Sequence, residues 1–387
     1  MGSKKRKKSG GNGRIYGKKK WIAAAVLLLV LGSVLVMGKN RAGGETDRAG
    51  VGTQSAGAKE DGAPKGQSAP VREFKNLCAY EGKVYCGAHG FFGEEIPVES
   101  NIFTIWDGKI YYVEKVQEAF ESLTDELMEM KRSNMDGSGV EVLADDVFLA
   151  GAGYEKLIGN KLFYGCGYDG NHFMRYVWVD VETGKKGEVS SDRIEGILGY
   201  DGTYLYYRGN DRETERNVLG RVHLEEGRDE ILTAFAAVDE EGYIEHAAYT
   251  DGRLYCFTLA EKPEGYDYRT FVYRLEIRSP ETGEVEDVLP MDFTGSANYS
   301  FLVQDGEVYA AAAGEIIAVA LDGGEKRTVT AMEDGEYWGI LYFLPGDGWL
   351  YYEAIAEINE KTGNNDYFYR VPAEGGKKEL LSEWYTM

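Results

Sequence analysis

One short pattern of polar and apolar positions recurs along most of this chain: a polar or small residue, Gly or Asn, a variable residue, an aliphatic residue, then Tyr or Phe. Gly or Asn after an acidic residue can take the left-handed backbone conformation of a tight hairpin turn, and the aliphatic and aromatic residues suit a pleated strand. Each copy therefore predicts a turn that leads into a strand. The seven copies begin at Glu81, Asp107, Gly159, Asp201, Asp251, Asp305 and Asp347, the fourth with one extra residue.

A second set of polar, Gly-containing turns alternates with the last six copies. These turns begin at Met135, Val181, Leu224, Pro280, Leu321 and Ala373. A repeat of roughly 40 to 50 residues made of two hairpins is typical of a β-propeller, in which each repeat folds as one four-stranded blade. We therefore predict an all-β fold, a β-propeller of six or seven four-stranded blades.

The first copy of the pattern leaves the blade count open. It precedes the second copy by only 26 residues, which leaves no room for a second hairpin of normal size. The copy at Glu81 is therefore either a reduced seventh blade or a source of strands that close the ring against the last blade. Closure matters because an open ring exposes sheet edges that pair with other chains.

One stretch departs from the strand pattern. Between Val116 and Met130, apolar residues recur at helical spacing. Two interpretations stay open: a short helix near Glu118 to Asp125 followed by a strand, which we favour, or a third strand over residues 127–135. Inserts of this kind project from one face of a propeller, where binding sites usually lie.

An uncharged apolar segment precedes the repeats, and we predict that residues 21–38 form one transmembrane helix. Its first, central and last apolar positions are Trp21, Leu28 and Met37. This length is at the lower edge of what spans a hydrocarbon core of about 30 Å. Residues 1–20 contain nine Lys and Arg and no acidic residue, which predicts a cytoplasmic N-terminus.

A cleaved signal peptide is the alternative interpretation of the same segment. The apolar stretch exceeds the roughly 7 to 15 residues usual for a signal peptide, and no typical small-residue cleavage site follows it. We therefore favour a retained signal anchor in the cell membrane, single-pass, with the N-terminus inside and the propeller outside.

The remainder divides into a linker and a strongly acidic folded part. Residues 39–72 are rich in Gly, Ala, Ser and charge, which predicts a disordered linker. Residues 73–387 then form the extracytoplasmic propeller. They hold 28 Lys and Arg against 61 Asp and Glu, after 15 and 4 preceding residues are subtracted from totals of 43 and 65, a formal charge of about −33. Such a surface disfavours nucleic acid and favours cationic partners.

Residue patterns that carry familiar chemistry are sparse. No histidine has a partner at metal-ligand spacing, and neither a phosphate-binding loop nor a nucleophile elbow is present. We therefore predict no catalytic residue, no metal and no cofactor. The four histidines are His89, His172, His223 and His246.

The cysteines and aromatics carry two weaker hypotheses. Cys78 and Cys86 flank the first turn and would form a disulfide if the hairpin register allowed it. The Tyr residues of the repeat are expected to pack between blades, alternating in the face to which they point. A sugar- or peptide-stacking surface needs aromatics in loops, and the candidates for this ligand face are Phe91, Phe92, Tyr266, Tyr268, Tyr337 and Trp338.

The repeated Asp-Gly-x-aliphatic-Tyr-Tyr opening, with the Leu-Asp-Gly-Gly and Met-Asp-Gly-Ser-Gly turns, resembles bacterial membrane-tethered propeller proteins of unknown function. These look like the six-bladed YWTD propellers of low-density lipoprotein receptors, although the tetrapeptide itself is absent here and Ile110 to Val113 is its nearest approach. The resemblance runs from about Asn76 to Leu381. The turn that starts at Asp180 is also similar to those of quinoprotein-like propellers, but the Trp expected after it is missing.

Two functions from different classes are compatible with these features. The leading hypothesis is a membrane-anchored binding or scaffolding module for a protein, peptide or envelope ligand. The alternative is a propeller enzyme, a lyase, hydrolase or quinoprotein-like dehydrogenase, with its site at the central channel. A channel lined by clustered His, Arg and carboxylates favours the enzyme, whereas one lined by Gly, Ala and backbone favours the scaffold.

Overall fold

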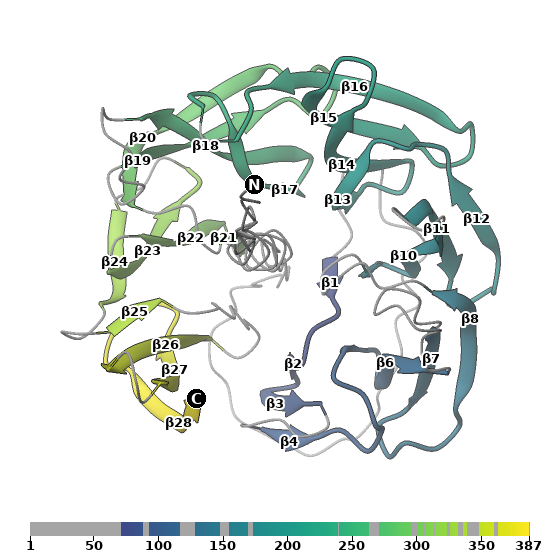
Figure 1. The fold of residues 1–387 in the computed structure, drawn as a ribbon, viewed down its shortest axis with the longest axis horizontal. Coiled ribbons are helices and arrows are strands. Elements are labelled where there is room, and N and C mark those ends of the chain that lie inside the picture. Colours follow the sequence, from purple (N-terminus) through teal and green to yellow (C-terminus); the bar gives the residue numbers. More distant parts are fainter. Residues whose placement is uncertain are drawn as a thin grey trace, which may run out of the picture.

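The computed structural model shows sheets arranged radially around a central axis, which is the arrangement of a β-propeller (Figure 1). All regular elements among the described residues are strands, so the all-β prediction is confirmed for that part of the chain. No helix in it is long and apolar enough to cross a membrane. The structure describes residues 71–87, 93–116, 128–147, 155–168, 173–238, 240–262, 271–295, 301–304, 306–312, 314–322, 326–331, 336–338, 348–359 and 363–386.

Four sheets repeat one simple order, in which four consecutive strands pair antiparallel from the innermost to the outermost. The first comprises β13 (Ile194–Tyr200), β14 (Tyr204–Asp211), β15 (Arg216–His223) and β16 (Arg228–Phe235), and the second β17 (Ile244–Thr250), β18 (Arg253–Glu261), β19 (Phe271–Arg278) and β20 (Val285–Gly295). The third comprises β21 (Phe301–Gln304), β22 (Glu307–Ala312), β23 (Glu315–Ala320) and β24 (Lys326–Ala331), and the fourth β25 (Glu336–Trp338), β26 (Trp349–Asn359), β27 (Gly363–Pro372) and β28 (Glu379–Thr386).

Two further sets of four strands share one larger sheet because a single residue pair, Val147 with Cys166, joins them. One set is β5 (Phe103–Trp106), β6 (Lys109–Lys115), β7 (Met128–Asn134) and β8 (Glu141–Val147), and the other is β9 (Lys156–Ile158), β10 (Lys161–Tyr168), β11 (Phe173–Asp180) and β12 (Lys186–Val189). The strand β1 (Val71–Glu73) adds to the inner edge of β9. It therefore lies closer to the axis than the strand it pairs with (Figure 1).

The first copy of the sequence pattern forms a small three-stranded sheet. It comprises β2 (Leu77–Tyr80), β3 (Lys83–Cys86) and β4 (Glu94–Glu95). One of its faces packs Leu77 and Val84 against Tyr351 of β26, and the other packs Tyr80 against Tyr112 of β6. The small sheet therefore lies between the last set of four strands and the first.

The predicted turns have the backbone conformation that the sequence implies. In the hairpins at Asp107 and Asp251, both central residues have positive φ, 48° and 66° for Asp107 and Gly108 and 48° and 74° for Asp251 and Gly252. Positive φ at both positions is the signature of the turn type that matches the twist of paired strands. The hairpin prediction is confirmed at these copies.

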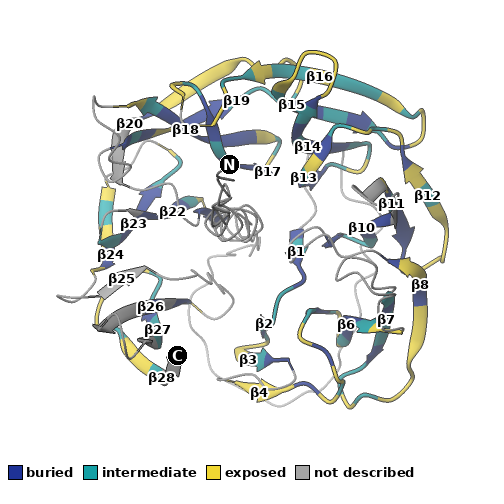
Figure 2. Ribbon diagram, in the orientation of Figure 1, coloured by how far each residue is buried: buried dark blue, intermediate teal, exposed yellow. Residues whose placement is uncertain are grey.

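The strand order gives the ring two distinct faces. The chain passes from the outermost strand of one sheet to the innermost strand of the next, so all innermost strands run in the same direction. We call the face at which they begin the strand-start face, and the face that carries the Asp-Gly turns the turn face. Inner strands are mostly buried, whereas outer strands expose many residues (Figure 2).

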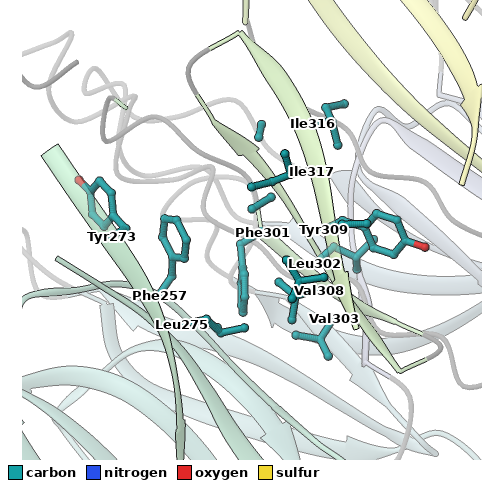
Figure 3. Packing of buried hydrophobic residues seen from close by; sticks show 14 of the residues in the cluster. Phe257, Tyr273, Leu275, Phe301, Leu302, Val303, Val308, Tyr309, Ile316 and Ile317 are labelled. Atoms are coloured by element: carbon teal, nitrogen blue, oxygen red, sulfur yellow. The ribbon is translucent and has the colours of Figure 1, made fainter. Parts of the chain in front are cut away.

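Aromatic residues fill the space between neighbouring sheets. Phe257 of β18 stacks on Tyr273 of β19, with ring centroids 5.0 Å apart, and meets Phe301 of β21 at 6.1 Å (Figure 3). In β14, Tyr206 packs towards the sheet that follows and Tyr207 towards the sheet that precedes. The predicted alternation of the paired tyrosines is therefore confirmed in this strand.

An arginine joins each of several sheets to the next. Arg221 of β15 lies in register between Tyr206 and Glu230. Its guanidinium donates to Glu230 at 2.7 Å and to the carbonyl oxygen of Pro280, in the outer turn of the following sheet, at 3.1 Å. Hydrogen bonds to charged partners are stronger than neutral ones. This contact therefore fixes one sheet against its neighbour.

Two other arginines also donate to a backbone carbonyl oxygen of the next sheet. Arg132 of β7 pairs with Glu141 and donates to the carbonyl oxygen of Val181 in the next sheet. Arg327 of β24 donates to the carbonyl oxygen of Ala373. In each case, the acceptor lies in the outer turn of the sheet that follows. The contact between neighbouring sheets therefore recurs at equivalent positions around the ring.

Two local predictions are resolved by the strand register. Cys78 pairs with Tyr85, and Cys86 pairs with Leu77, so adjacent positions point the two thiols to opposite faces of the hairpin. The suggested disulfide is therefore wrong, and both cysteines are free. Residues 128–134 form the third strand of their sheet, while the helix suggested near Glu118 to Asp125 lies outside the described residues.

Candidate functional site

The predicted ligand face is only partly within the described structure. Tyr337 and Trp338 lie in β25, where they pair with Ile355 and Ala354 of β26. The other four candidates, Phe91, Phe92, Tyr266 and Tyr268, lie outside the described residues, as do Trp21, Leu28 and Met37 of the predicted span. The structure therefore does not test whether these aromatics form one surface.

The strand-start face carries a feature that the sequence pattern did not reveal. The register of β13 with β14 shifts between Ile194 and Gly196, and the register of β17 with β18 shifts between Ile244 and His246. The extra residue is a glutamate in both strands, Glu195 and Glu245. Bulges of this kind re-aim a side chain and are enriched near functional sites. Two neighbouring innermost strands thus present a bulged carboxylate at the same end of the ring.

An arginine and two aromatic rings lie beside this pair of carboxylates. Arg208 of β14 donates to the backbone carbonyl oxygen of Glu245 at 2.8 Å and to the hydroxyl of Tyr243. Its guanidinium carbon lies 5.1 Å from the Tyr243 ring centroid and 5.8 Å from that of Phe235. These two bonds hold the Arg208 guanidinium between the backbone of Glu245 and the ring of Tyr243.

Electrostatics around Tyr243 follow from this arrangement. Burial raises the pKa of the Tyr243 hydroxyl, Arg208 opposes that rise, and the carboxylates of Glu245 and Glu195 add to it. Glu195 is exposed, and it forms no ion pair with any other described residue. The site therefore offers carboxylate charge to solvent beside a fixed aromatic platform.

A second charged group lies one sheet away, where β1 meets β9. Glu73 is fully buried and bonds the ammonium group of Lys156, and Lys75 approaches its other oxygen at 2.9 Å. Burial alone would raise the pKa of Glu73, but the two lysines together hold it below its ordinary value. This cluster neutralises its own charge and fixes β1 in place.

Glu155, immediately before β9, has a different environment. Its side chain has no exposed surface, and neither carboxylate oxygen has a hydrogen-bond partner among the described residues. Burial raises the pKa of Glu155 to about 8. The group is therefore mostly protonated at neutral pH, which avoids a buried unpaired charge.

The histidines do not assemble a metal site in the described part of the chain. His246 is buried, with ring centroids 6.4 Å from those of both Phe257 and Phe301. His223 lies on the turn face near Glu226. No group of three or more potential ligands occurs among the described residues, and His89 and His172 lie outside them.

Three glutamates lie near the strand-start face. The starts of β9, β13 and β17 bring Glu155, Glu195 and Glu245 to one end of three successive sheets. Of these three residues, Glu195 is exposed, and an exposed carboxylate attracts cations. Aromatic rings near it suit ammonium or guanidinium groups.

No protein-family model matches the sequence, and no curated protein matches it. Among solved structures, the chain is similar to an oligogalacturonate lyase in complex with manganese (16% identity, TM-score 0.43, 58% of this chain and 63% of that chain). It is also similar to TolB from Acinetobacter baumannii (12%, 0.40, 70% and 65%) and to an acylaminoacyl peptidase from Pyrococcus horikoshii (12%, 0.48, 70% and 44%). The chain spans less than two thirds of the length of each. At these identities and TM-scores, the ligands and reactions of those proteins do not transfer to it.

Proposed function

We propose that this protein is a membrane-anchored, extracytoplasmic propeller of seven blades, with β2 to β4 as the reduced blade, that binds a cationic protein, peptide or envelope ligand at its strand-start face. The observation that carries the proposal is the pair of bulged glutamates, Glu195 and Glu245, at the same end of adjacent innermost strands. The net charge of about −33 on residues 73–387 supports attraction of the same ligand class over longer range.

The enzyme alternative has one observation in its favour, the raised pKa of Glu155, because perturbed carboxylates are common in active sites. Glu155 has no exposed surface, however, so a substrate does not reach it in this conformation. The nearby Glu73 is neutralised by two lysines. The geometry therefore supports binding better than catalysis.

The test is titration of the full-length protein in detergent with a fluorescent decalysine peptide. The variant carries Glu195→Gln and Glu245→Gln, and the matched control carries Glu182→Gln and Glu281→Gln, two exposed glutamates in turns of the turn face. Surface charge pairs contribute up to about 1 kcal/mol each, so we expect the first variant to raise Kd about three- to tenfold and the control to change it less than twofold. Equal losses in both variants would show that the peptide responds to total charge, and the assigned face would be wrong.

A further inference from the structure

We infer that the membrane tether leaves the ring on its turn face, so that the strand-start face points away from the bilayer and receives its cationic partner from the far side. This inference rests on the proposed anchoring and binding face, and it adds the orientation in which the ring is displayed. It follows from the direction of one short strand.

The direction of β1 is fixed by its register with β9. Val71 lies opposite Ile158, next to the turn at Gly159, whereas Glu73 lies opposite Lys156 at the start of β9. The strand β1 therefore runs from the turn face towards the strand-start face. Val71, where the described chain enters the ring, therefore lies towards the turn face and on the axis side of β9 (Figure 1).

The contacts of β1 hold this direction firmly. Val71 is 2% exposed and belongs to the core that contains Tyr176 and Tyr207. The guanidinium of Arg72 lies 5.5 Å from the Trp106 ring centroid, and Glu73 forms its buried ion pairs. A reversed entry would break all three contacts, so the tether cannot switch to the other face while the ring stays folded.

Because the predicted linker is short, the direction of β1 also determines which face of the ring points towards the bilayer. The linker was predicted over residues 39–72, but residues 71 and 72 belong to β1. The other 32 residues, taken as the disordered chain that their composition predicts, would have an r.m.s. end-to-end distance of about 30 Å. To present the strand-start face to the bilayer, the linker would have to leave the axis, cross the turn face and pass the rim. Deleting residues 44–60 leaves 15 residues and shortens that distance to about 20 Å, which should sharpen the preference.

The partner expected on the outward face is a protein or peptide with clustered Lys or Arg rather than a lipid headgroup. The bilayer lies on the turn-face side in this orientation, while Glu195 and Glu245 lie on the other. A net acidic domain is also repelled by anionic headgroups.

The experiment measures energy transfer from the ring to the membrane in proteoliposomes of the full-length protein. One dye is placed at Glu182→Cys on the turn face and, in a second protein, at Glu213→Cys in the exposed connection between β14 and β15. Both changes remove one glutamate, and both use a Cys78→Ala background because Cys78 is the least buried native thiol. The acceptor is a rhodamine-labelled headgroup lipid.

We expect at least twofold more transfer from the Glu182 position than from the Glu213 position, and a larger ratio after deletion of residues 44–60. Equal or reversed transfer in the shortened protein would overturn the orientation while leaving anchoring intact. Loss of transfer from both positions, together with release of the protein from vesicles by alkaline carbonate, would instead refute the anchoring and the orientation with it. Strong transfer from Glu213 with anionic vesicles alone would identify a lipid as the ligand of the strand-start face.

Discussion

The buried carboxyl group of Glu155 should make this protein less stable as the pH rises through neutrality. Its oxygens are without hydrogen-bond partners among the described residues, and burial raises its pKa from 4.5 to about 8. Between these two values, the folded protein keeps a proton that the unfolded chain releases. Folding stability therefore falls as the pH rises from about 4.5 to about 8, and it levels off above that range.

The size of this effect follows from the two pKa values. One pKa unit corresponds to about 1.4 kcal/mol, so a change from 4.5 to about 8 corresponds to a loss of about 5 kcal/mol at pH 9 and about 3 kcal/mol at pH 7. Glu155→Gln keeps the shape of the side chain but does not ionise. At pH 5, the variant and the wild type should differ little, whereas at pH 8 to 9 the variant should be more stable by several kcal/mol.

The assay is urea unfolding of the full-length protein in detergent, followed by tryptophan fluorescence at pH 5, 6, 7, 8 and 9. The difference between the two proteins at each pH isolates Glu155, because other titrating groups contribute equally to both. Glu182→Gln, an exposed turn residue, serves as the matched control and should give a flat difference. A difference between Glu155→Gln and wild type that stays within about 0.5 kcal/mol from pH 5 to 9 would refute the reasoning.

Three further predictions concern the contacts that hold the ring together, each measured by urea unfolding at pH 7. Lys156→Met should cost about 3 to 5 kcal/mol because it leaves the buried Glu73 with one partner, whereas Lys83→Met, in an exposed pair, should leave the midpoint unchanged; equal effects would contradict the role given to β1. Arg221→Met should cost about 2 to 3 kcal/mol through its lost bonds to Glu230 and to the next sheet, and an unchanged midpoint would show that this link is not stabilising. Gly220→Ala should cost about 1 to 3 kcal/mol, since its Cβ would lie 2.3 Å from a ring carbon of Tyr207, and a neutral result would mean that the ring moves freely.

Local features of this fold were predictable because they depend on neighbours in sequence. The turns at Asp107 and Asp251 adopt positive φ at both central positions because Gly takes this conformation without steric cost and Asp tolerates it better than most residues. The paired tyrosines of β14 face opposite sheets because a strand alternates its side chains. These predictions needed only the pattern of one repeat.

The bulges of the candidate site were not predictable from that pattern. A bulge adds one residue to one of two paired strands, and periodicity along a single strand does not show which residue is extra. The shared Ile-Glu dipeptide at Ile194 and Ile244 was a signal that a comparison of repeats would have found. Likewise, the pairing of β1 with β9 joins residues 83 positions apart at Glu73 and Lys156, which no local rule anticipates.

A repeated arginine–glutamate pair within the sheets was visible in the sequence but was not recognised; two of its arginines, Arg132 and Arg221, also bond to the next sheet. The distance from arginine to its glutamate is nine residues in the pairs Arg132 with Glu141, Arg221 with Glu230, and Arg370 with Glu379. A constant spacing arises because the third and fourth strands of these sheets meet through turns of matched length. The spacing therefore reports a contact between strands, and the contact explains why an acidic chain keeps basic residues at these positions.

The interior pairing of charges also determines how acidic the outside of the ring is. Glu73 forms ion pairs with two lysines, and Glu276, which is 3% exposed, forms ion pairs with Arg274 and Arg278. Each of these buried carboxylates has two basic partners, so the buried acidic groups are compensated locally and the net charge of about −33 on residues 73–387 is carried mainly by the surface. Exposed charges act through solvent and are screened by salt, whereas buried pairs are not. Binding of a cationic partner to the strand-start face should therefore weaken steeply between low and physiological salt, while the stability of the ring changes little.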